Sequence, residues 1–409
     1  MKIAILMMQK NESELLEKWI RYHGYLVGFE NLYVYDNGSV EPVIKETLNV
    51  FEHLGVNVEY GFNERCHFES KGELFCKKIK ELEFEKPEID FFIPLDCDEF
   101  LGFLDDEGNV SCDKTGLYSL MCNYKGRREL LLVDSQYYNN SVSDSYFNKQ
   151  PYRKCFFYKN TIKSLDVGFH WGKVKDSESE YKTRLVHYHF HNKPFTVGKA
   201  HAREKLKGRV DNFEPQTIAA YKGAGLHLVR FFTQDESSYV SNQLNLQHIY
   251  SAALKLKFNE LGIAWPYSSE LIKSRNELGL KTPQEGFQNL VPYFSGSIDF
   301  LGFDVNSREL AIKGWGVYQK GVAPEIFYLS FASGLDIKIQ VNNRVVRADV
   351  SKMLNMRVSE IGFEETLTIH DDIKLEGEFT VVVKSNYHSK CYQFDISKKY
   401  QNLFTKSDV

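Results

Sequence analysis

The first hundred residues alternate short apolar runs with amphipathic segments. Four apolar runs have the length of a buried strand: 2–8, 31–35, 56–60 and 91–95. Three segments between them carry apolar residues at helical spacing: 12–27, 41–54 and 72–82. Strands that alternate with helices predict an α/β fold, in which a parallel sheet has helices on both faces.

The pattern changes twice further along the chain. Residues 101–195 are mixed, with a strand at 129–133, an aromatic loop at 137–147 and a His-rich strand at 184–191, whereas 199–280 is mostly helical. The segment 239–261 has helical spacing and lacks Pro and Gly. Short strand-like runs then recur with Gly, Asn and Asp between them, at 300–303, 309–315, 326–331, 337–341, 366–369 and 379–384. We expect domains at 1–200 and 294–409, the second a β-sandwich, joined by a helical extension at 201–293.

Polar side chains follow three of the predicted parallel strands. Asp96, Asp98 and Glu99 end the strand at 91–95, Asn11 and Glu12 follow the first strand, and Asp36 and Asn37 follow the second. Ligands bind at the carboxyl ends of parallel strands. If the strands are adjacent, these groups converge, with Asp96 and Asp98 able to share one divalent cation and the others able to bind a nucleoside.

Each of these motifs also has a purely structural interpretation. Asp-X-Asp after a strand can be an acidic turn, Asp36-Asn37-Gly38 can be a tight turn, and Asn11 with Glu14 can form a helix capping box. The sequence contains no GxGxxG or Walker loop, so dinucleotide redox chemistry and P-loop hydrolysis lack support.

Composition narrows the class of protein. The 409 residues are 43% hydrophobic and 26% charged, as in an ordinary soluble protein, and the net charge of −4 argues against a general nucleic-acid binder. Seven cysteines form no CxxC pair, and no apolar stretch approaches the ~20 residues that span a bilayer. We therefore expect reduced thiols and a cytoplasmic location, with contact at the inner membrane surface left open.

Taken together, the N-terminal motifs resemble those of nucleotide-sugar-dependent glycosyltransferases of the GT-A fold, and more narrowly of families 2 and 92. The resemblance is carried by Met8-Gln9-Lys10-Asn11-Glu12, by the helix containing Trp19 and His23, by Tyr35-Asp36-Asn37-Gly38-Ser39 and by Asp96-Cys97-Asp98-Glu99-Phe100. It implies a Rossmann-like nucleotide-sugar-binding domain. By spacing, Trp19 and His23 face the sheet and are expected to be structural.

The resemblance also implies roles for individual residues. The donor-binding residues that it implies are Asp36 and Asp96. Asn11, Glu12 and Asn37 are expected to join them from their places at the strand ends, and Lys154 because a basic residue suits a diphosphate. The implied ligands of Mn²⁺ or Mg²⁺ are Asp96 and Asp98, with His187 as first choice of histidine and His170 as second. His187 shares a predicted strand face with His189 and His191, which is also compatible with a solvent-exposed polar face.

The predicted catalytic residues are Asp166 and Glu99. Asp166 would take the proton of the acceptor hydroxyl, with Asp144 as a rival, and Glu99 would aid the acceptor or support the metal site. The acidic pair usual in family 2 is not clearly readable, which leaves the inverting outcome open. Basic residues at 153–154 and along 199–209 suit a diphosphate, an anionic lipid surface or a solvated helix face.

The C-terminal module resembles a β-sandwich found on bacterial polysaccharide-assembly enzymes, through Gly314-Trp315-Gly316, Arg347-Ala348-Asp349-Val350 and Gly362-Phe363. It implies an accessory role in acceptor binding or in homo-oligomer formation. Trp315 fits either a sugar-stacking or a core position.

The leading hypothesis is a metal-dependent glycosyltransferase that takes a sugar from a nucleotide-sugar donor, with a UDP-sugar as the expected class. The expected acceptor is a glycan or lipid-linked glycan in bacterial surface polysaccharide or lipopolysaccharide assembly. Two alternatives stay open. One is a non-catalytic glycan-binding protein, and the other is a metal-dependent hydrolase of nucleotide sugars.

Overall fold

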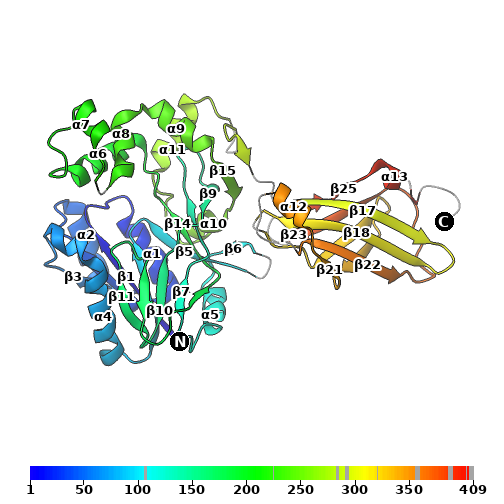
Figure 1. Ribbon diagram of the computed structural model, residues 1–409, viewed down its shortest axis with the longest axis horizontal. Coiled ribbons are helices and arrows are strands. Elements are labelled where there is room, and N and C mark those ends of the chain that lie inside the picture. The colour runs from blue at the N-terminus through cyan, green and yellow to red at the C-terminus, as the bar shows by residue number, and fades with distance from the viewer. Residues whose placement is uncertain are drawn as a thin grey trace. The chain divides into compact units, whose positions relative to one another are not determined.

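The four N-terminal apolar runs form parallel strands of one sheet in the computed structural model (Figure 1). The structure describes residues 1–105, 108–223, 225–281, 285–290, 294–319, 321–354, 360–385, 390–401 and 403–404. The strands are β1 (Lys2–Gln9), β2 (Leu32–Asp36), β3 (Asn57–Glu59) and β4 (Ile89–Asp96), in the order β4-β1-β2-β3. All three pairings are parallel, which confirms the predicted parallel sheet.

The helices between these strands are α1 (Leu16–Val27), η1 (Phe29–Asn31), α2 (Pro42–His53), α3 (Arg65–Glu69) and α4 (Lys71–Glu85). The capping-box interpretation of Asn11 is wrong, because α1 begins at Leu16 with Leu15 in the N-cap position. Asn11 instead accepts hydrogen bonds from the segment after β2, which ties the ends of β1 and β2 together.

Three further strands extend the parallel sheet beyond β4. They are β7 (Leu130–Leu132), β10 (Cys155–Tyr158) and β13 (Glu180–Lys182), which complete the order β13-β7-β10-β4-β1-β2-β3. Strand β10 runs antiparallel to both β4 and β7. A hairpin of β11 (Ile162–Leu165) and β12 (Gly172–Val174) follows β10.

A second sheet has the order β16-β15-β9-β8-β14-β5-β6. Its strands are β5 (Glu99–Leu104), β6 (Val110–Ser111), β8 (Ser135–Tyr138), β9 (Tyr146–Gln150), β14 (Leu185–His189), β15 (Gln247–Tyr250) and β16 (Asn289–Leu290), with α5 (Lys114–Cys122) after β6. The pairing of β14 with β5 is antiparallel and joins the His-rich strand to the Asp96–Glu99 turn. The segment 137–147, predicted as an aromatic loop, contains the end of β8 and the start of β9.

Short helices occupy most of 195–277: α6 (Phe195–Leu206), α7 (Pro215–Ala220), η2 (Leu226–Val229), α8 (Arg230–Thr233), α9 (Glu236–Leu244), α10 (Ala253–Glu260) and α11 (Ser268–Glu277). The prediction of one helix across 239–261 is wrong. Strand β15 divides this segment, and in it Ile249 pairs with Phe147 and Tyr250 with Tyr146 on β9. Cross-strand pairing with a distant segment outweighs local helical spacing here.

The chain divides into two units, which we describe separately. Unit 1 contains Met1–Asp105 and Val110–Leu290, so the helices of 201–290 belong to the same unit as the parallel sheet. Unit 2 contains Asp106–Asn109 and Val291–Val409.

Of the helices that the structure describes, none has the length and apolar character needed to cross a membrane.

Unit 2 consists of two sheets that share one apolar core. One sheet contains β17 (Phe294–Asp304), β18 (Glu309–Tyr318), β21 (Arg344–Val345), β22 (Gly362–Thr368) and β25 (Asp395–Ile396), and the other contains β19 (Ile326–Phe331), β20 (Asp336–Gln340), β23 (Phe379–Ser385) and β24 (Lys390–Gln393). Helices α12 (Ala348–Met353) and α13 (Lys398–Gln401) complete the unit. Trp315 is half-buried against a small cluster of Val317, Val350 and Ile361.

His23 has the structural role expected for it. Its ring is fully buried on α1, where Nε2 accepts a hydrogen bond from the Leu101 backbone N–H at 3.3 Å. The other ring nitrogen, Nδ1, then carries the proton and donates it to the Trp19 carbonyl oxygen at 2.9 Å. Burial lowers the pKa of His23 to about 3, so the neutral ring is part of the folded state.

This burial predicts a loss of stability in mild acid. The unfolded chain takes up the His23 proton at a pKa of about 6.5 and the folded chain only near 3. His23 therefore contributes a fall in the free energy of unfolding of about 1.4 kcal/mol per pH unit as pH drops through that window. We expect His23→Gln to flatten this dependence in urea titrations between pH 7 and 4. The exposed His53 is the control, and His53→Gln should keep the wild-type slope. An unchanged slope in His23→Gln would contradict the assignment.

Candidate functional site

The carboxyl ends of β1, β2 and β4 meet at one edge of the parallel sheet. Gln9 at the end of β1 pairs with Asp36 at the end of β2, and Met8 pairs with Asp96 at the end of β4. The register therefore brings the predicted residues of three separate motifs to one place. Open α/β sheets bind ligands at this edge.

At the end of β2, the side chains of Asp36 and Asn37 form hydrogen bonds with neighbouring segments. The Gln9 side chain donates to Asp36 Oδ1 at 2.7 Å, and the Ser39 backbone N–H donates to Oδ2 at 3.1 Å. The Asn37 side chain donates to the carbonyl oxygens of Phe62 and Glu64. The side chains of both residues thus fix the segment after β2, and a role in binding a nucleoside stays a prediction.

After the end of β1, the side chains of Asn11 and Glu12 bind groups from other segments. Asn11 has a left-handed backbone with φ of 52°, and its Oδ1 accepts the Val40 N–H at 2.9 Å. The Glu12 carboxylate binds the ammonium of Lys193 at 2.6 and 2.9 Å. Lys193 follows β14 and is 7% exposed, so this pair connects β1 to the second sheet.

Asp96 lies between two buried lysines. Lys71 Nζ is 2.6 Å from Oδ1, and Lys154 Nζ is 2.7 Å from Oδ2. Lys154 also contacts Glu99 Oε1 at 3.0 Å, and the other oxygen of Glu99 accepts the Asp96 backbone N–H at 3.0 Å. Two acids and two ammonium groups thus form a charge-balanced cluster, which we call the Asp96 cluster.

Electrostatic interactions keep Asp96 and Lys154 ionised despite their burial. Burial alone would raise the pKa of Asp96, but the charges of Lys154 and Lys71 outweigh it and lower the pKa well below its usual range. Lys154 shows the reciprocal effect, because Asp96 and Glu99 overcome its burial and raise its pKa. The ring of Phe169 lies 4.4 Å from Lys71 Nζ and 5.2 Å from Lys154 Nζ, which favours both cations.

Asp98 faces β14 rather than the lysines. Its Oδ2 is 3.4 Å from Nε2 of His189, and its backbone oxygen accepts the Phe190 N–H at 2.8 Å. His189 Nδ1 lies 2.7 Å from the side-chain oxygen of Gln136. The charge of His189 outweighs burial and lowers the pKa of Asp98, while Asp98 raises the pKa of His189 against the effect of burial.

The two histidines predicted as metal ligands, His187 and His170, contact other groups than Asp98. His187 is buried, with Nδ1 3.8 Å from Glu99 Oε2, and burial lowers its pKa to about 4. His170 lies in the loop after β11, where Nδ1 is 2.6 Å from the Arg153 carbonyl oxygen. The structure therefore places His189, and not His187 or His170, beside the second acid of the Asp-Cys-Asp motif.

The predicted catalytic acids also have defined surroundings. Glu99 is fully buried within the Asp96 cluster. Asp166 accepts backbone N–H groups from Gly168 at 3.1 Å and Trp171 at 2.7 Å, which shapes the loop that carries Phe169. The rival Asp144 pairs with Lys255 at 2.6 Å. Transfer of the acceptor proton by any of them stays a prediction.

Cys97 lies between the two aspartates and is 4% exposed. Burial, followed by the charges of Glu12 and Asp98, raises the pKa of its thiol well above the usual value. The thiol is therefore protonated at neutral pH.

The residues at this edge fit a divalent cation only in part. A carboxylate oxygen of Asp98 and an imidazole nitrogen of His189, 3.4 Å apart, are donors of the kind that Mn²⁺ accepts. Asp96 is engaged by two lysines, and within the part of the chain that the structure describes no three His, Cys, Asp or Glu side chains are grouped to hold an ion. An ion here would need oxygens of a bound phosphate, as Mg²⁺ commonly does.

The sequence interpretation missed Lys71, Lys193 and Gln136 and gave His189 no role. Lys71 and Lys193 stand in ordinary polar stretches, and only the tertiary fold brings them to Asp96 and Glu12. His189 had a usable signal, since it shares a strand face with His187. The β14–β5 register aligns His189 with Glu99 and His187 with Leu101, and it could not be read from the sequence.

Comparisons with known proteins give only distant likenesses. No model of a protein family matches the sequence, and no curated protein matches it. Among solved structures, TarS of S. aureus is 9% identical with a TM-score of 0.26, covering 97% of this chain and 78% of that chain. TarS 1–349 in complex with UDP is 10% identical with a TM-score of 0.29, covering 59% and 75%. A cytidylyltransferase from Leptospira borgpetersenii is 17% identical with a TM-score of 0.21, covering 32% and 53%. At these TM-scores the likenesses carry no argument, and the interpretation rests on the site itself.

The Asp96 cluster predicts a large and non-additive effect of losing one charge. Lys154→Met leaves Asp96 and the fully buried Glu99 with a single cation, and breaking a buried pair in this way costs about 3–5 kcal/mol. Adding Glu99→Gln should recover part of the loss, because it removes the uncompensated charge. Chemical denaturation of the single and double variants measures both effects.

The surface pair of Lys182 with Asp134 provides the control. The Lys182 side chain is 58% exposed, and Lys182→Met should cost less than about 1 kcal/mol. Equal costs for Lys154→Met and Lys182→Met, or additive effects of Lys154→Met and Glu99→Gln, would contradict the description of the cluster.

Proposed function

We propose that this chain is a glycosyltransferase that moves a sugar from a nucleotide-sugar donor to a glycan acceptor. The observation that carries the proposal is the register of β1, β2 and β4, which gathers Asp36, Asp96 and Asp98 at one sheet edge. The order and spacing of the same residues support it, because they resemble the motifs of the GT-A families. A UDP-sugar and a bacterial surface glycan are the donor and acceptor classes that this resemblance implies.

The edge offers different chemistry at its two ends. The β2 end, with Asp36 and Asn37, carries a carboxylate and an amide suited to the hydroxyl groups of a nucleoside. The β4 end carries Asp98 with His189, and the ammonium groups of Lys71 and Lys154 lie beside it. The diphosphate of a donor would lie at the β4 end, beside the divalent ion that Asp98 and His189 would hold.

Asp98 and His189 would hold the divalent ion predicted from the sequence, together with the diphosphate. When bound, such an ion offsets the negative charge that develops on the leaving nucleotide. The protein residues orient the donor: Lys71 and Lys154 fix the Asp96 carboxylate, and Gln136 fixes the His189 ring.

A nucleotide-release assay tests the proposal and separates it from its alternatives. The purified chain is incubated with UDP-, GDP- and CMP-sugars and Mn²⁺, with and without methyl glycosides of glucose, galactose, mannose and N-acetylglucosamine. Release that requires a glycoside supports transfer. Release without a glycoside favours hydrolysis, and no release with any donor favours a glycan-binding protein; either result contradicts the proposal.

Asp98→Asn tests the site within the same assay. It keeps the size of the side chain and removes the charge, so we expect release to fall about 100-fold or more. Asp176→Asn is the matched control, because Asp176 forms a surface pair with Arg128 and should leave the rate unchanged. Full activity of Asp98→Asn would remove the acidic turn from the active site.

A further inference from the structure

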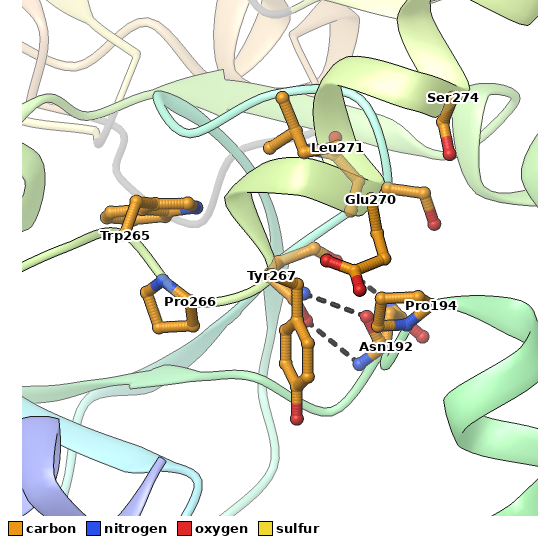
Figure 2. Close-up of a pocket in the computed structure, with 11 residues that line it drawn as sticks. Asn192, Pro194, Trp265, Pro266, Tyr267, Glu270, Leu271 and Ser274 are labelled. Atoms are coloured by element: carbon orange, nitrogen blue, oxygen red, sulfur yellow. Dashed lines mark hydrogen bonds between the residues drawn. The ribbon is translucent and has the colours of Figure 1, made fainter. Parts of the chain in front are cut away.

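A pocket lies beside the candidate site in unit 1, and none of the predicted site residues lines it. Three segments enclose it: 139–141, 192–194 and 265–274 (Figure 2). Its walls surround about 290 Å³ of space that includes open solvent, so the pocket is a hollow open to the surface of unit 1.

One wall of the pocket is held rigidly. The Asn139 side chain donates to the Asn192 carbonyl oxygen at 2.9 Å, and Asn192 returns a backbone and a side-chain hydrogen bond to Asn139 at 2.8 and 2.7 Å. Asn140 Oδ1 accepts the N–H groups of Val142 and Ser143. These amides fix the shape of the wall, which preserves a preformed hollow.

The opposite wall contains a strained residue. Tyr267 has φ of 57° and ψ of 32°, the left-handed region, which costs a bulky L-residue about 1–2 kcal/mol. Its N–H donates to Glu14 Oε1 at 3.0 Å, and its carbonyl oxygen accepts the Leu271 N–H at 2.9 Å. Strain of this kind persists where the surroundings enforce it, and it concentrates at functional sites.

The pocket adjoins the sheet edge. Lys193, which binds Glu12, stands in the chain between Asn192 and Pro194, two residues of the pocket wall. Tyr267, which lines the pocket, is tied through its backbone N–H to Glu14, two residues after Glu12.

The lining indicates the class of ligand. Trp265, Pro266 and Tyr267 supply ring surfaces, and Trp265 is fixed against Phe190 and Phe258 at centroid distances of 5.2 and 5.8 Å. Figure 2 shows the Glu270 carboxylate directed toward Asn192 and Pro194. Rings pack on the C–H faces of a sugar, and a carboxylate accepts hydrogen bonds from its hydroxyl groups. The same negative charge disfavours an anionic nucleotide.

We propose that this pocket binds one neutral saccharide ring of the acceptor, with Glu270 accepting hydrogen bonds from its hydroxyl groups. The assignment of the saccharide as acceptor rests on the proposed function. The binding itself does not, because it can be measured without transfer.

Ligand-observed NMR with the four methyl glycosides tests the proposal on the full chain. Ser274→Trp fills the pocket from α11 and should abolish the binding of any glycoside that the wild type binds. Glu270→Gln should weaken that binding about tenfold, as expected for loss of a charge-assisted hydrogen bond. Glu277→Gln, on the same helix with a side chain 54% exposed, is the matched control and should bind as the wild type does.

Binding of UDP, followed by calorimetry on the same variants, separates the two proposals. Unchanged UDP affinity in Ser274→Trp with loss of glycoside binding supports a separate saccharide pocket. Loss of UDP affinity in Ser274→Trp would assign the pocket to the donor and overturn the proposal. Glycoside binding that survives Ser274→Trp, or no binding of any glycoside to the wild type, would overturn it as well. Pocket-dependent glycoside binding in a chain that transfers no sugar would contradict only the proposed function.

Discussion

The carboxylate of Asp96 is the point at which three separate pieces of unit 1 are joined. It ends β4, and it binds Lys71 at the start of α4 and Lys154 before β10. Removing charges from water costs several kcal/mol per ion, and only well-placed counter-charges repay that cost. The backbone beside these charged groups is therefore closely packed. A Cβ at Gly72 would lie 2.3 Å from the Leu165 carbonyl oxygen, so only glycine lets α4 approach the loop that carries Phe169.

Each of the three acids Glu12, Asp96 and Asp98 at this edge of the sheet has a positively charged partner. Glu12 has Lys193, Asp96 has two lysines, and Asp98 has His189. An edge of paired charges has little net charge, whereas a diphosphate brings two negative ones. A divalent ion bound by Asp98 and His189 would bring two positive charges while the His189 ring gives up its proton, so it would offset part of the charge of the diphosphate.

The parallel sheet and its acidic edge could be predicted because they depend on local signals. Apolar runs mark β1, β2 and β4, and in parallel strands their polar ends must meet. The partners of those acids could not be predicted. Lys71 is 25 residues from Asp96 and Lys154 is 58 residues away, and neither stands in a distinctive pattern. β15 was missed for a related reason, since its strand conformation comes from β9, about a hundred residues earlier, and not from its own composition.

The burial of Cys97 bears on how the edge responds to oxidants and alkylating reagents. Such reagents attack the thiolate, and this thiol is protonated and almost inaccessible between two ionised carboxylates. Cys66 and Cys122 are exposed and would be modified first. We therefore expect the Cys97 thiol to react more slowly with such reagents than the thiols of Cys66 and Cys122.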